Sequence, residues 1–173
     1  KQDHYQLHWN QKYNNNWSTN LGLNYTYGRG FFEQYKEDED FADYDFVPFT
    51  ILRDSANVAI RDTVNTTDLV RRRWLDNDFY VINATANYKN ESVDIDFGGF
   101  YSLYDGDHFG EVIWAQNAGG SELRDRYYFG NGKKEEFTIF AKSTYRINEQ
   151  WSAFIDLQGR FISYETTGDT SDR

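Results

Sequence analysis

The sequence predicts an all-β chain: an antiparallel meander of about six strands, in three long hairpins, that forms part of a transmembrane β-barrel. Aromatic residues make up 19% of the 173 residues, although hydrophobic residues make up only 39%. Polar and apolar side chains also alternate with period two over six segments. A barrel strand faces lipid with every second residue, so its mean hydropathy stays low while interfacial aromatics raise the Tyr, Trp and Phe content.

The first hairpin is predicted from residues 3–13 and 17–28. In the second of these segments, Leu23 and Tyr25 belong to an apolar side of the extended chain, and small or polar residues occupy the other side. An amphipathic helix does not produce this alternation, because its period is 3.6 residues. An Asn-rich stretch at 13–16 separates the two segments and predicts the turn between them.

The second hairpin is predicted from strands at 74–88 and 92–104, and the third from strands at 135–146 and 151–165. In each hairpin an aromatic residue on the apolar side precedes the short turn, at Tyr13, Tyr88 and Tyr145. Amphipathic rings favour the boundary between hydrocarbon and water, so these residues predict the short-turn side of a membrane. The alternative is cross-strand aromatic packing in a soluble sandwich.

The connections between the hairpins are long and charged. We expect residues 29–73 and 105–134 to be loops that face outward, because outer-membrane barrels combine short turns on one side with long loops on the other. The basic run from Arg71 to Arg73 is interpreted as the solvated start of a strand. The formal net charge of −10 predicts no nucleic-acid partner, since phosphate binding needs a basic field.

Candidate ligand-binding residues lie in the expected outward loops. We select Asp107, His108, Glu111, Trp114, Arg124 and Arg126 for contact with a ligand, although for His108 a role in a turn is favoured. The acidic segment 33–45 offers a weak candidate metal site, with Glu37, Asp38, Glu39 and Asp40 as ligands for Ca²⁺. It lacks the spacing and the glycine of a calcium loop, so a solvated loop is favoured. His4 and His8 lie roughly 13 Å apart on a strand, too far to share a metal, and are expected to line a polar interior.

No catalytic motif is present. The chain has no cysteine, and it has no hydrolase elbow, phosphate-binding loop, dinucleotide fingerprint or HExxH zinc motif. Asp94 and Asp96 are the kind of carboxylate pair that glycosidases use. They lie on the same polar side of one strand, however, and are interpreted as part of the polar inner wall of the barrel. We therefore expect neither an enzymatic activity nor a cofactor.

Five strings stand out along the chain: LGLNYTYGRG at 21–30, EQYK at 33–36 with the acidic segment after it, WLDNDFY at 74–80, YDGDHFGEVIW at 104–114 and RDRYYF at 124–129. Together they resemble the barrel region of TonB-dependent receptors from Bacteroidetes-type bacteria. The resemblance implies a bacterial outer-membrane location and import of a nutrient such as a ferric siderophore, haem, cobalamin or a glycan. It also implies a barrel of about 22 strands around an N-terminal plug.

This chain holds only about six of the strands that the family requires. We therefore expect the rest of the barrel, the plug and the segment that contacts TonB to lie elsewhere in a longer protein. The sequence has no Met and no signal peptide, and its end at 168–173 lacks the terminal aromatic of a barrel's last strand. The expected partners are outer-membrane lipid, the remaining barrel and plug, TonB and the imported nutrient.

Two alternatives remain at this stage. One is a soluble β-sandwich carbohydrate-binding module, in which the aromatic side forms the core and the acidic segment binds calcium and sugar. The other is a fragment of a secreted glycosidase, which requires two carboxylates at catalytic separation in one cleft.

Overall fold

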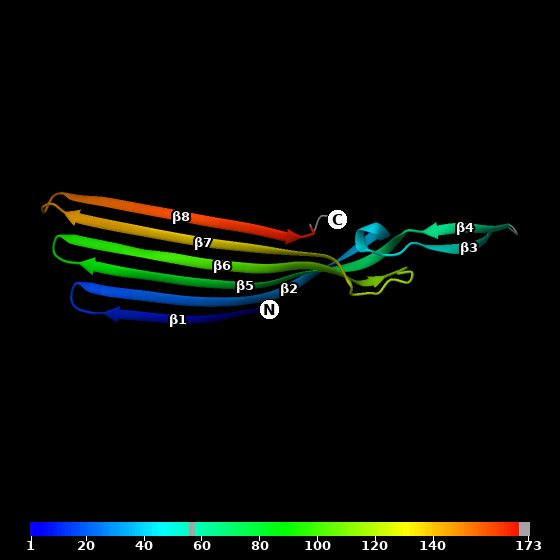
Figure 1. Ribbon diagram of the computed structural model, residues 1–173, viewed down its shortest axis with the longest axis horizontal. Coiled ribbons are helices and arrows are strands. Elements are labelled where there is room, and N and C mark those ends of the chain that lie inside the picture. Colours follow the sequence, from blue (N-terminus) through cyan, green and yellow to red (C-terminus); the bar gives the residue numbers. More distant parts are fainter. Residues whose placement is uncertain (56–57, 170–173) are drawn as a thin grey trace. The chain divides into compact units, whose positions relative to one another are not determined.

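A computed structural model describes residues 1–55 and 58–169. Six strands form one sheet in the order β1 (Gln2–Lys12), β2 (Trp17–Asp40), β5 (Thr66–Lys89), β6 (Val93–Ala115), β7 (Arg126–Arg146) and β8 (Ser152–Gly168) (Figure 1). A separate antiparallel pair consists of β3 (Phe49–Ser55) and β4 (Val58–Val64), and one short 3-10 turn, η1, spans Phe41–Tyr44. The predicted all-β, antiparallel meander is confirmed.

Two predicted segments fall partly outside the described residues. Residues 56–57 belong to the expected loop 29–73. Residues 170–173 belong to the chain end, where the terminal aromatic of a last barrel strand was sought. No helix in the described part of the chain is long and apolar enough to cross a membrane.

Most of residues 29–73, which were predicted to form a loop, belong to strands, so the predicted loop was too long. β2 continues to Asp40, and β5 already begins at Thr66. Between them lie η1 and the pair β3–β4. The charged residues of this segment form cross-strand contacts with aromatic rings and with each other, which local sequence does not reveal.

The expected loop 105–134 is also shorter than predicted. β6 continues to Ala115, and β7 begins at Arg126. Only residues 116–125 connect the two strands in the described structure.

The described chain divides into two compact units. Unit 1 comprises residues 1–28, 77–106 and 132–165, and unit 2 comprises residues 29–76, 107–131 and 166–173. Unit 1 therefore contains the three short turns, whereas unit 2 contains η1 and the β3–β4 pair.

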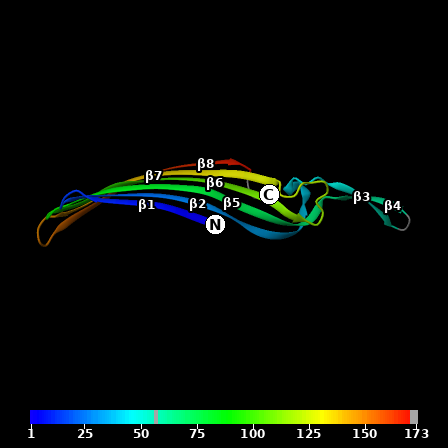
Figure 2. The ribbon, with the colours of Figure 1, turned by 90° about the horizontal axis from the view of Figure 1, so that it is seen from below.

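Unit 1 is a single sheet with one apolar and one polar face. In the register of β1 and β2, Leu7 lies opposite Leu23, and Gln6 lies opposite Asn24. Figure 2 shows the strands of this unit in one layer. The alternation in the sequence is thus matched across strands, as period-two side-chain geometry requires.

Each of the three short turns of unit 1 is stabilised by an asparagine side chain. Asn14, Asn90 and Asn148 each accept two hydrogen bonds on the side-chain oxygen, from the backbone N–H groups two and three residues further along, at 2.7–2.9 Å. Asparagine favours such turns because its side chain replaces a backbone acceptor. The turn predicted at 13–16 is confirmed.

Unit 2 has a conventional buried core. The large buried side chains are Phe41, Tyr44, Phe46, Leu69, Val112, Tyr127 and Tyr128. They bring η1 against β5, β6 and β7. The rings of Phe41 and Phe46 meet edge to face at 5.6 Å, a favoured geometry for aromatic pairs.

Candidate functional site

The apolar face of unit 1 is uncovered. Fifteen of its large side chains are 38% to 68% exposed, and others, such as Leu21, Leu23 and Tyr25, are partly buried by their neighbours. The exposed ones are Tyr5, Leu7, Trp9, Trp17, Tyr80, Ile82, Phe97, Tyr101, Phe137, Ile139, Tyr145, Trp151, Ile155, Leu157 and Phe161. By contrast, every large hydrophobic side chain that is buried in the described part of the chain belongs to unit 2. Soluble monomers rarely expose a contiguous apolar patch of more than a few hundred Å², so this face is a surface for contact with something apolar.

Aromatic rings organise this face from strand to strand. Tyr25 stacks on Tyr5 at 5.8 Å and on Tyr80 at 4.8 Å, so the row crosses β1, β2 and β5. Near the turns, Trp17 meets Tyr88 at 4.9 Å. These cross-strand pairs fix the rings in place.

The opposite face of unit 1 is mostly polar and internally hydrogen-bonded, although β8 also exposes Phe154, Ile162 and Tyr164 on it. On β1 and β2, His4 contacts the Thr26 hydroxyl at 2.9 Å. Between β2, β5 and β6, Asn20 donates to Asn87 at 3.0 Å, and Asn87 donates to Asp96. His4 thus lies on the polar face, as expected.

Ion pairs continue this polar face towards β8. Arg160 donates to both carboxylate oxygens of Glu136, at 2.7 and 2.9 Å. Lys89 pairs with Asp94 at 2.8 Å. Asp94 and Asp96, the carboxylates considered for glycosidase chemistry, therefore each have a neighbouring partner on this face.

Three of the predicted ligand residues have side-chain partners within unit 2. Asp107 accepts a hydrogen bond from the Asn131 amide at 2.8 Å, and Glu111 accepts one from the Trp74 indole at 3.3 Å. The guanidinium of Arg126 lies over the Phe109 ring, 3.9 Å from its centroid.

The other three predicted ligand residues are arranged differently. His108 and Trp114 are exposed on β6. Arg124 has a positive φ of 75° and donates its backbone N–H to the Val112 carbonyl. A cleft of about 270 Å³ in unit 2 includes Arg126 among its lining residues but none of the other five. The six residues therefore do not share this cleft.

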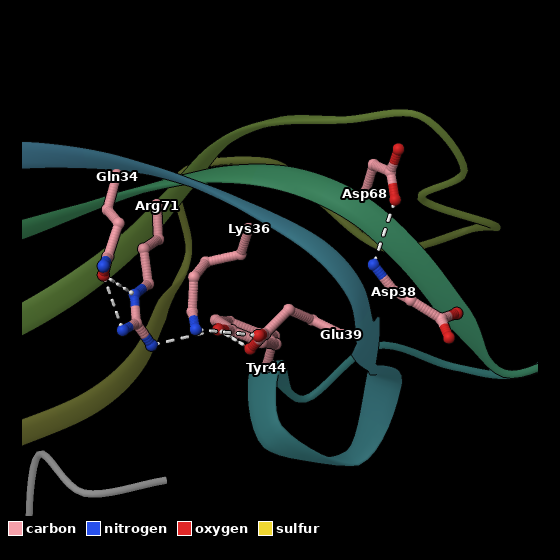
Figure 3. Close-up of polar contacts among 7 residues, drawn as sticks. All are labelled: Gln34, Lys36, Asp38, Glu39, Tyr44, Asp68 and Arg71. Atoms are coloured by element: carbon pink, nitrogen blue, oxygen red, sulfur yellow. Dashed lines mark hydrogen bonds and ion pairs between the residues drawn. The ribbon is translucent and has the colours of Figure 1, made fainter.

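Arg71 is buried, which corrects the interpretation of the basic run as solvated. It is only 8% exposed. Its guanidinium donates twice to Gln34, at 3.1 and 2.7 Å, and once to the Tyr44 hydroxyl at 3.1 Å (Figure 3). The charge is tolerated because hydrogen bonds satisfy its donors. Arg71 thus anchors η1 to β2 and β5.

Glu39 completes this network. The Tyr44 hydroxyl donates to Glu39 at 2.5 Å, and Lys36 lies 3.1 Å from the same carboxylate (Figure 3). Burial raises the pKa of Glu39, but the hydrogen bonds from Tyr44 and Lys36 outweigh it and hold the pKa below its ordinary value. Burial and the Glu39 carboxylate raise the pKa of the Tyr44 hydroxyl. The network therefore keeps the carboxylate charged and the phenol neutral.

The acidic segment has structural contacts of its own. Asp38 has a positive φ of 52° and donates its backbone N–H to Asp68 at 3.0 Å. Asp40 caps η1 by accepting from the Ala42 N–H at 2.9 Å. Within residues 1–55 and 58–169, no three His, Asp or Glu side chains are grouped to hold a metal ion. The calcium hypothesis gains no support from this arrangement.

A row of arginines and aromatic rings crosses three strands of unit 2, β2, β5 and β6, and it was not predicted from the sequence. Arg29 lies 4.9 Å from the Trp74 ring, and Arg72 lies 4.0 Å from the Phe31 ring. The Trp74 ring in turn lies 4.6 Å from Phe31 and 5.9 Å from Phe109. The sequence did contain a sign of this row: the period-two pattern of β2 continues through Arg29, Phe31 and Glu33, which occupy every second position of the strand.

Comparison with protein-family models, with curated proteins and with solved structures finds no match to this chain. The resemblance to TonB-dependent receptors therefore stays a prediction.

Proposed function

We propose that this chain is part of the β-barrel of a bacterial outer-membrane receptor of the TonB-dependent type, which imports a nutrient such as a ferric siderophore, haem, cobalamin or a glycan. The observation that carries the proposal is the uncovered apolar face of unit 1. In the proposal, acyl chains cover this face, and the polar face lines the lumen.

The energetics favour a cover of this kind. Full burial of one large apolar side chain contributes about 1.5 to 3 kcal/mol, and unit 1 leaves many such side chains exposed on one face. A bilayer supplies the missing apolar surroundings without a second protein layer. It also requires every backbone polar group to be paired, which an antiparallel meander achieves everywhere except at its outermost strands.

The short turns fit the same proposal. Tyr13 and Trp17 flank the first turn, and Tyr145 and Trp151 flank the third. All four rings are at least 41% exposed. Tyr and Trp at such positions favour the boundary between hydrocarbon and water. In the proposal they form an aromatic girdle on the short-turn side.

The soluble sandwich is the competing proposal. A sandwich divides its strands between two packed sheets, whereas here six strands form one sheet and the apolar face of unit 1 is exposed. A soluble module of this structure would need another protein layer over that face. The test below separates the two.

Single cysteines provide the test, because residues 1–173 contain none and any cysteine elsewhere in the intact protein can first be replaced by serine. We suggest cysteine substitutions at Asn20, Leu21, Leu23 and Asn24 in the intact protein, followed by labelling in isolated outer membranes with a water-soluble maleimide. The proposal predicts labelling at positions 20 and 24 and protection at 21 and 23. Equal labelling at all four positions, or recovery of the intact protein in the soluble fraction, would contradict it.

The nutrient requires a separate experiment. Growth of a deletion strain on defined iron, cobalamin and glycan sources shows which uptake is lost. Normal growth on every source would argue against an import function.

A further inference from the structure

A polar groove of about 500 Å³ lies on the polar face of unit 1. Four amide side chains line it, from Gln2, Gln6, Asn24 and Asn77, and these come from β1, β2 and β5. Neither the exposed apolar face nor the core of unit 2 contributes to it. The groove was not evident in the sequence because its residues are spread over four strands, β1, β2, β5 and β6.

The groove has no formally charged lining. The chain carries 28 Asp or Glu and 18 Lys or Arg residues, yet none of them lines this groove. Its only titratable imidazole, from His4, contacts Thr26. A ligand with several charges would find no counter-charge here, and desolvating those charges would be costly.

The amides are held in place and keep hydrogen-bonding capacity. Gln6 donates to the Asn24 carbonyl oxygen at 3.1 Å, and Asn24 donates to the Thr26 hydroxyl at 3.2 Å. Each amide has two N–H donors and an oxygen with two lone pairs, so one bond to a neighbour leaves others for a ligand. The groove therefore presents fixed donors and acceptors side by side.

Two aromatic rings complete the lining. Phe79 of β5 and Tyr104 of β6 are half-buried beside the amides. Neither belongs to the buried core; the Tyr104 ring packs over Gly106, whereas the Phe79 ring lines the groove beside the amides. A ring flanked by amides matches a ligand that has apolar C–H faces and hydroxyl edges.

We infer that this groove binds a segment of a neutral oligosaccharide. The hydroxyl groups bond to Gln6, Asn24 and Asn77, and a sugar face stacks on Phe79. This inference rests on the proposed function and deepens it, because it selects an uncharged glycan from the possible nutrients. An uncharged peptide is the competing ligand, but it does not offer the flat C–H face that the rings accommodate.

The test is isothermal titration of the intact protein in detergent. The neutral probes are maltohexaose, xylohexaose and a short fructan. Hexagalacturonate serves as the anionic probe, and an uncharged Gly/Ser hexapeptide serves as the peptide probe. We expect binding of at least one neutral oligosaccharide and weaker or no binding of the other two probes.

Substitutions locate the binding in the groove. Phe79→Ala and Asn24→Ala should each weaken the binding about tenfold, the scale of one aromatic or hydrogen-bonded contact. Phe79→Leu keeps the apolar bulk and should also weaken binding, which separates stacking from packing. Tyr80→Ala, on the opposite face, is the matched control and should leave the affinity unchanged.

Three results would overturn the inference: no binding of any neutral oligosaccharide, equal binding of the charged or peptide probe, or full affinity in both Phe79 variants. The cysteine labelling needs no ligand, so it reports on the proposed function separately. Period-two protection without sugar binding refutes this inference alone. Loss of the period-two pattern refutes the barrel proposal.

Discussion

Replacing Leu23 with arginine should destabilise the protein in a membrane far more than the same change at Asn24. Leu23 lies opposite Leu7 on the apolar face, whereas Asn24 lies opposite Gln6 on the polar face. An arginine facing lipid near mid-membrane costs about 2 to 4 kcal/mol, which is about a 30- to 700-fold loss in the folding equilibrium.

The cost at Asn24 is worked from its contacts. Asn24 accepts one hydrogen bond from Gln6 and donates one to Thr26. A net hydrogen bond contributes about 0.5 to 1.5 kcal/mol, and arginine retains donors that can replace part of this. We therefore expect Asn24→Arg to cost about 1 kcal/mol.

The assay is urea unfolding of the intact protein in phospholipid vesicles, followed by tryptophan fluorescence. Leu23→Ala removes the side chain without adding a charge, so it separates the cost of the charge from the cost of lost apolar contact. Equal destabilisation by the two arginines would refute the assignment of faces. A larger effect at Asn24 would reverse it.

Three further predictions concern packing, turns and pH. Gly110→Ala should lower the free energy of unfolding by about 1 to 3 kcal/mol, because an added Cβ would collide with the rings of Tyr127 and Tyr128. Near-ultraviolet circular dichroism should report the loss of aromatic packing. An unchanged spectrum and stability would contradict the prediction. Asn148→Ala should lower the free energy of unfolding by about 1 kcal/mol, because two backbone N–H groups lose their acceptor. Urea unfolding would measure this change. An unchanged stability would argue against the turn geometry. Hydrogen bonds from the backbone N–H of Asp38 and from the Tyr35 hydroxyl lower the pKa of Asp68. A carboxyl with a lowered folded-state pKa stabilises the fold above its unfolded pKa, so this stability should be lost as pH falls below about 4, and Asp68→Asn should remove that part of the acid dependence of the melting temperature.

The two faces of unit 1 could be predicted because each strand carries the full pattern in its own sequence. Leu21 and Leu23 alternate with Asn20 and Asn24, and the register of β1 and β2 then pairs like with like. A shift of one residue would move the apolar set to the polar side, so alternation strongly restricts the register. The six-stranded meander followed from these local patterns alone.

The strand extensions in unit 2 could not be predicted in the same way. Their alternating residues are charged or aromatic, as in Arg29 and Phe31, and charge density normally indicates a loop. The pairing is visible only across strands: Arg72 lies over Phe31, and its Nη2 lies 2.6 Å from Glu33. Stacking on a ring and pairing with a carboxylate make an arginine compatible with a strand.

Long-range contacts also explain why the candidate site changed. The predicted ligand residues were chosen from local strings, and only Arg126 lines the cleft in unit 2. The polar groove instead combines Gln6, Asn24, Phe79 and Tyr104, which are far apart in sequence. No local motif contains such a set, because the topology of the meander brings it together.

The two units are stabilised by different means, and this difference is the strongest constraint on function. Unit 2 buries Phe41 and Leu69 completely and holds the charged Arg71 with hydrogen bonds, as a water-soluble fold does. Unit 1 leaves Trp151 and Leu157 at least 67% exposed, although its polar face is extensively hydrogen-bonded. The apolar face of unit 1 therefore needs an apolar cover that the described residues do not supply. In our proposal the acyl chains of a bilayer cover this face, and the cysteine labelling distinguishes that cover from a second protein layer.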